Sequence, residues 1–100
     1  MGELMRQAAR MQRKIEQAKE AAGTQEVTGT AVGDKVKATV TYARKVVRIE
    51  IDKETLGSEE TDLVLDGVCA AINQGIEQAD KQMETELEKV TGGVKIPGML

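Results

Sequence analysis

Aromatic side chains are almost absent from this chain of 100 residues, which contains no Phe, no Trp and a single Tyr, Tyr42. Because aromatic rings bury more area than other side chains, the core must be built from Val, Ile, Leu, Met and Ala. We expect residues 1–100 to form a single domain, and a domain of this size buries only a modest share of its surface. A homodimer is therefore expected, in which a second copy supplies apolar contact; a small monomer of modest stability is the alternative.

The scarcity of aromatic residues also restricts the possible nucleic-acid ligands. Proteins that bind single strands usually stack the bases on aromatic rings. The only ring here, Tyr42, falls on the predicted apolar side of a strand. A nucleic-acid partner is therefore expected to be double-stranded DNA, held through its phosphates.

Histidine is absent and cysteine occurs once, at Cys69. Zinc sites are built mostly from His and Cys, so no metal site is expected, and no nucleophile, base and acid are grouped as in a hydrolase. The glycines near residues 29–33 and 92–93 lack the spacing of phosphate-binding or dinucleotide-binding loops. The sequence therefore predicts that the chain is not an enzyme and takes no cofactor and no small-molecule substrate.

Long apolar runs are absent as well. No stretch reaches the length of a membrane-spanning helix, and the first residues lack the apolar segment of a signal peptide. Cys69 lies in the apolar run GVCAAI, where a free Cys is usually a buried apolar side chain rather than a redox group. We expect a cytoplasmic protein with no membrane partner.

The spacing of apolar residues divides the chain into a helix, a sheet and a longer helix. Apolar residues recur at steps of three and four over residues 3–22 and 59–90, which is typical of helices. Over residues 26–52 they alternate with polar residues, which is typical of strands. The sequence thus predicts an α+β fold with a helix, a three-stranded antiparallel sheet, a long helix and a flexible tail over residues 91–100.

Short polar segments set the limits of the long helix. Residues 53–57 are predicted to form a loop, and Ser58 to cap the helix that follows. Gly92 and Gly93 are predicted to end that helix.

The long helix is too long for the sheet. A helix of roughly 32 residues spans about 48 Å, whereas a strand of seven residues spans about 23 Å. The helix must therefore extend beyond the sheet, and either the first helix or a second subunit must cover its apolar stripe. Small residues in this helix either allow close backbone approach or are simply tolerated; they are Gly67, Ala70, Ala71 and Gly75.

A second copy is expected to cover part of the apolar surface of the sheet and of the long helix. The predicted dimer interface consists of Val36, Ala38, Val40, Val47, Ile49, Ile72 and Ile76.

Charge is unevenly distributed along the chain. Residues 1–57 contain 11 Lys or Arg and 8 Asp or Glu, a net charge of +3, and residues 58–90 contain 2 and 9, a net charge of −7. With Lys95 the sum is the overall charge of −3. The acidic residues of the long helix either keep the protein soluble or pair with basic residues of a neighbouring element, and they weaken long-range attraction to a polyanion.

The basic residues of the first helix share the side opposite its apolar stripe. They are Arg6, Arg10, Arg13 and Lys14. Because a guanidinium group can contact two phosphate oxygens at once, this stripe predicts contact with DNA; an ordinary solvated helix face is the alternative.

Further basic residues lie on the sheet, its last turn and the long helix. Those predicted to contact DNA are Arg44, Lys45, Arg48, Lys81 and Lys89. For Lys35 and Lys37, prevention of aggregation at a strand edge is an equally good explanation.

Three segments of the chain resemble, in this order, the YbaB/EbfC family of bacterial nucleoid-associated proteins. They are LMRQAARMQRKIEQAKE, EVTGTAVGDKVKATVTYARKVVRIEID and GGVKIPGM. The resemblance implies a helix–three strands–helix subunit and a homodimer whose sheets join and whose helices project as paired, tweezer-like arms. It also implies binding to duplex DNA with little sequence preference, and an influence on nucleoid organisation and gene expression.

The basic positions of the first of these segments carry over to this chain as Arg6, Arg10, Arg13 and Lys14. The alternative function is a dimeric protein-interaction module that binds no DNA, in which the arms grip a partner protein and the basic stripe only aids solubility.

Overall fold

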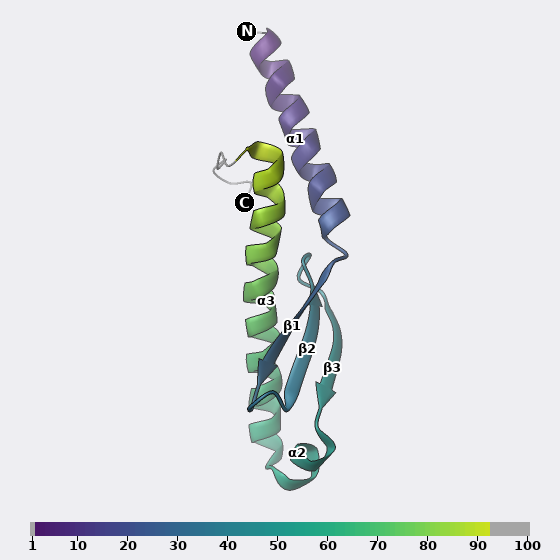
Figure 1. The fold of residues 1–100 in the computed structure, drawn as a ribbon, viewed down its shortest axis with the longest axis vertical. Helices are drawn as coiled ribbons and strands as arrows, with labels where there is room; N and C mark the ends of the chain where they lie inside the picture. The colour runs from purple at the N-terminus through teal and green to yellow at the C-terminus, as the bar shows by residue number, and fades with distance from the viewer. Residues whose placement is uncertain (1, 93–100) are drawn as a thin grey trace.

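The computed structural model describes residues 2–92 and shows an elongated molecule of 66 × 20 × 17 Å (Figure 1). Its elements are α1 (Gly2–Ala22), β1 (Glu26–Ala31), β2 (Val36–Thr41), β3 (Val46–Ile51), α2 (Lys53–Ser58) and α3 (Thr61–Thr91). The predicted α+β class, with a helix, a three-stranded antiparallel sheet and a long helix, is confirmed. Of the predicted tail, Thr91 belongs to α3, and residues 93–100 lie outside the described residues.

The strands lie in the order β1-β2-β3, and both pairs are antiparallel. Gly29, Ala38 and Ile49 lie opposite one another across the sheet. An irregularity follows Thr39, because Thr39 pairs with Arg48 whereas Val40 pairs with Val46. Val47 is therefore an extra residue in β3, and it is 47% exposed although its alternation with polar neighbours predicted an inward position.

Helix α3 packs mainly on β1 and β2 and comes less close to β3, whose Ile49 and Ile51 are partly buried against the same core. The contact is close because Gly67, Ala71 and Gly75 face the sheet and are buried. A Cβ atom added to Gly29 would overlap the backbone of Ala71 and Gly75. The small residues thus have a packing role, except Ala70, which is exposed.

Beyond the sheet, α3 continues alongside α1, which runs in the opposite direction (Figure 1). We call α1 together with residues 81–91 of α3 the arm. Ile15 of α1 and Leu87 of α3 are almost completely buried. The prediction that the long helix extends past the sheet is confirmed, and α1 is the element that lies along the overhang.

The N-terminal part of α1 reaches past the end of α3 (Figure 1). Leu4 and Met5 are therefore 71% and 70% exposed. Within the described residues, burial of the apolar side of α1 begins at Met11.

Two predictions at the start of α3 are wrong. Residues 53–57 are not a loop but lie in the short helix α2, because the Asp52 carboxylate caps that helix and accepts a hydrogen bond of 3.2 Å from the Thr55 N–H. Ser58 is the last residue of α2 and does not cap α3, which follows Glu60. At the other end, Gly92 stops α3 in a left-handed conformation (φ 66°), as predicted.

Cys69 also differs from expectation. Its thiol is free and exposed, because the sheet covers only the side of α3 that contains Ala71 and Gly75.

Candidate nucleic-acid interface

The basic stripe of α1 is fully available to a ligand. Arg6, Arg10, Arg13 and Lys14 are all exposed, and their spacing places them on one side of the helix. Arg6 lies 4.0 Å from the Glu3 carboxylate and donates to the Gly2 carbonyl. Arg10, Arg13 and Lys14 make no ion pair within residues 2–92.

Most of the other predicted DNA-contacting cations are paired with a carboxylate. The pairs are Arg44 with Asp80 (3.4 Å), Arg48 with Glu50 (2.9 Å), Lys81 with Glu77 (3.8 Å) and Lys89 with Glu86 (3.1 Å). Exposed pairs of this kind contribute little to stability, about 0–1 kcal/mol each. Their carboxylates nevertheless compete with any phosphate that approaches the same cation.

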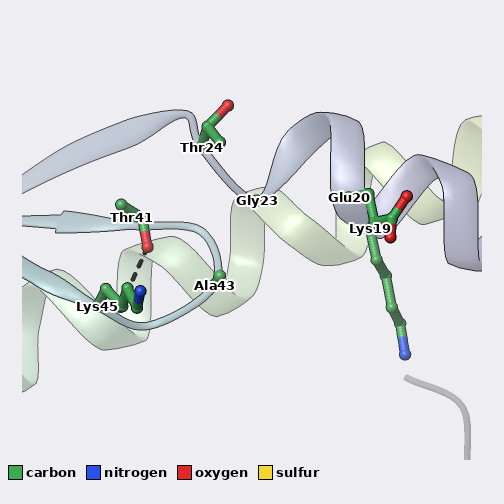
Figure 2. A pocket seen from close by; sticks show the side chains of 7 residues that line it. All are labelled: Lys19, Glu20, Gly23, Thr24, Thr41, Ala43 and Lys45. Atoms are coloured by element: carbon green, nitrogen blue, oxygen red, sulfur yellow. Dashed lines mark hydrogen bonds between the residues drawn. The ribbon is translucent and has the colours of Figure 1, made fainter.

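Lys45 is the remaining predicted cation, and its side chain has no ion pair within the part of the chain that the structure describes. It lines an open hollow of about 480 Å³ between the last turn of α1 and the turn that joins β2 to β3 (Figure 2). The Lys45 N–H donates to the Thr41 hydroxyl oxygen over 3.1 Å, which positions the lysine at the end of the turn. Lys19 of α1 lines the same hollow, and Glu20 places one acid at its rim.

The residues predicted for a dimer interface fall into two groups. Val36, Ala38 and Val40 are 0% exposed in the single subunit, because α3 covers them, so they leave no surface for a second copy. The other four retain exposed area; they are Val47, Ile49, Ile72 and Ile76.

The two edges of the sheet also differ. On β1 the Thr30 N–H donates to the Gln74 side-chain oxygen over 2.5 Å, so α3 occupies part of that edge. The outer edge of β3 has no strand partner within residues 2–92. Val46 and Val47 of β3 are each 47% exposed, and Leu65 on α3 is 56% exposed.

Comparison with known proteins identifies the chain's relatives. Residues 1–94 match the YbaB/EbfC DNA-binding family. The chain belongs to this family. A protein of Clostridium kluyveri called a nucleoid-associated protein is 33% identical over 99 residues, with 99% of this chain and 87% of the relative covered. A protein of the same description from Pelotomaculum thermopropionicum is 32% identical, with 99% and 94% covered.

Structural comparison supports the same fold. The crystal structure of an uncharacterised Helicobacter pylori protein matches with a TM-score of 0.74 at 16% identity, covering 92% of this chain and 97% of that one.

The YbaB/EbfC family is a DNA-binding family and not a family of enzymes, which confirms the expectation that this member is not an enzyme. Within residues 2–92, no helix combines the length and apolarity needed to span a bilayer.

Two residues beside the candidate interface were not singled out from the sequence. Lys19 lines the hollow next to Lys45, and Asp80, which was counted only among the acidic residues of the long helix, pairs with Arg44. The pairs of Lys81 with Glu77 and of Lys89 with Glu86 could have been found from their helical spacing. The contact of Arg44 with Asp80 joins a turn to a distant helix, and no local spacing predicts it.

Proposed function

We propose that this YbaB/EbfC chain is a nucleoid-associated protein of the bacterial cytoplasm that binds duplex DNA as a homodimer and so influences nucleoid organisation and gene expression. The observation that carries the proposal is the stripe of unpaired cations on the exposed side of the arm, Arg10, Arg13 and Lys14. Three neighbouring cations that make no ion pair within the described residues attract a polyanion, and arginine is well suited to phosphate oxygens.

Phosphate contacts dominate in this proposal, and sequence preference is low. Long cationic side chains on one side of a helix can follow a DNA backbone, whereas contacts to phosphates carry no direct sequence information. The full set of proposed contacts comprises Arg6, Arg10, Arg13, Lys14, Arg44, Lys45, Arg48, Lys81 and Lys89. We expect the unpaired members of this set to contribute most, because they displace no carboxylate.

A second copy is proposed to join at the free edge of β3. Two β3 strands paired there would satisfy backbone groups that have no strand partner in the single subunit. The same arrangement would cover apolar side chains that α3 leaves uncovered, namely Val46, Val47, Ile49, Leu65, Ile72 and Ile76. The two arms would then project from a continuous sheet.

A gel-shift titration with several unrelated duplexes tests DNA binding. We expect similar affinities for all duplexes, and binding that weakens steeply as salt rises, because each phosphate neutralised contributes about 0.9 to the slope of log K against log salt. Absence of binding at low salt would contradict the proposal, and strong preference for one duplex would contradict the phosphate-dominated mode.

Light scattering tests the proposed dimer. The wild-type protein should show twice the mass of the 10.8 kDa chain, and Val46→Lys with Val47→Lys should show the mass of the chain alone, because charges would be buried at the joined edges. Lys35→Glu on the exposed turn before β2 is the matched control and should remain dimeric. A monomeric wild-type protein would overturn this part of the proposal.

The exposure of Leu4 and Met5 favours the second candidate, a protein-interaction module that uses the arm. Charge reversal at Arg6, Arg10 and Arg13 separates the two functions. It should abolish DNA retention if the stripe binds phosphate, and it should leave capture of a partner protein intact if the arm is a protein-interaction module.

A further inference from the structure

The ion pair of Arg44 and Asp80 links the turn between β2 and β3 to α3, with 3.4 Å between Nε of Arg44 and Oδ1 of Asp80. The two side chains are 63% and 53% exposed. A pair so open to water stabilises a fold only weakly, since solvent screens the attraction and ordering two side chains costs entropy.

The backbone of Arg44 is unfavourable for an arginine. Its φ of 71° lies in the left-handed region, which suits Gly and Asn but strains most other residues. Neither the backbone nor the weak ion pair therefore explains why a long cationic side chain occupies this position, and an outlier of this kind points to function.

We propose that the Asp80 carboxylate pairs with the Arg44 guanidinium group in the free protein and that a DNA phosphate displaces the carboxylate on binding. This inference rests on the proposed DNA-binding function. A phosphate can accept two hydrogen bonds from the guanidinium group, so it replaces the carboxylate with a partner of at least equal fit. Asp80 has no other partner within residues 2–92, so its carboxylate can turn into water when it is released.

The surroundings of Arg44 favour this exchange. Lys45, the next residue, has no ion pair within the described residues, and Lys19 lies across the neighbouring hollow. Arg48, by contrast, is held by both Glu50 and the Thr39 hydroxyl oxygen. A phosphate that binds Arg44 therefore has to displace only one group, the Asp80 carboxylate, whereas a phosphate that binds Arg48 has to displace two.

The test compares two substitutions that remove the same charge from α3, Asp80→Asn and Asp66→Asn. Asp66 has no ion pair among residues 2–92 and lies fourteen positions away, roughly 21 Å along the helix, which exceeds a Debye length of about 8 Å at physiological salt. Because Asp80→Asn removes a competitor from Arg44, it should tighten duplex binding about two- to fivefold, whereas Asp66→Asn should leave affinity nearly unchanged.

Arg44→Asn completes a double-mutant cycle, since Asn tolerates the left-handed backbone. It should lower the slope of log K against log salt by about one, and Asp80→Asn should have no further effect in its presence. The inference is overturned if Asp80→Asn does not tighten binding more than Asp66→Asn does, or if its effect persists without Arg44. A wild-type protein that retains no duplex at low salt would instead overturn the proposed function itself.

Discussion

The two halves of α3 bury different kinds of side chain. On the sheet, Gly67, Ala71 and Gly75 bring the helix backbone close to β1 and β2. In the arm, the large side chains of Ile15 and Leu87 fill the space between two helices. In the sheet half, the backbone of α3 contacts the backbone of β1, so no larger side chain fits between them. In the arm, one side of α1 faces away from α3 and carries cations. We therefore expect stability to depend most on the first region and the proposed DNA binding to depend most on the second.

The largest effect should come from Gly29→Ala. The new methyl group would overlap the backbone of Ala71 and Gly75, and backbone cannot move aside as a flexible side chain can. We expect the free energy of unfolding to fall by about 3 kcal/mol, measured by urea denaturation. Gly57→Ala is the control, since a Cβ there meets nothing within 4 Å, and it should be neutral or slightly stabilising. If Gly29→Ala left the free energy of unfolding unchanged, the sheet half of α3 would not be more tightly packed than the arm.

Neutralising the arm should affect binding without affecting stability. Replacement of Arg10, Arg13 and Lys14 by Gln removes three unpaired cations from an exposed surface. Since a hydrogen bond to a charged group contributes about 1.5–3 kcal/mol, the affinity for duplex DNA should fall about 100-fold or more in a gel shift. The unfolding midpoint should remain within error of the wild type, and a large loss of stability would show that the stripe supports the fold.

Single substitutions refine the comparison between unpaired and paired cations. Arg13→Gln should weaken DNA binding about tenfold, because Arg13 makes no ion pair within residues 2–92. Arg48→Gln should weaken it only about twofold, because Glu50 already accepts a 2.9 Å hydrogen bond from that guanidinium group. Fluorescence anisotropy with a labelled duplex measures both. Equal losses would show that internal pairing does not limit phosphate binding.

The smallest expected effect concerns α2, which lies at the far end of the molecule from the arm tip (Figure 1). Asp52→Ala removes the carboxylate that accepts from the Thr55 N–H. The free energy of unfolding should fall by about 1 kcal/mol, and DNA affinity should not change. Asp34→Asn, in the turn before β2, is the control: it removes an equal charge, caps no helix and keeps a side chain that tolerates the left-handed backbone there (φ 67°). A change in affinity with Asp52→Ala would extend the interface beyond the arm and the adjoining turn.

The class of each main element was predictable because its periodicity is local. The alternation around Ala38 and Ile49 and the helical spacing around Ile15 and Leu87 depend only on neighbours in the chain. The start of α3 was not predictable, because Ser58 is a good N-cap by residue type, whereas α3 begins after Glu60, whose side chain makes no capping hydrogen bond, and Asp52 caps the separate helix α2.

The candidate site was only partly predictable. The position of Arg10 and Arg13 opposite the apolar stripe follows from helix geometry alone. The ion pair of Arg44 with Asp80 was not predictable, because it forms only where the turn between β2 and β3 meets α3.

The sequence by itself determined the helix–sheet–helix order, the excess length of α3 and the gathering of cations on one side of α1, since each follows from spacing along the chain. Only the tertiary structure decided that α3 covers β1 and β2 and leaves β3 open, and that Leu4 and Met5 extend beyond any cover among the described residues. The physical reason is that the position of α3 on the sheet depends on the close approach of Gly29 to Ala71 and Gly75, a contact between distant segments that periodicity does not encode.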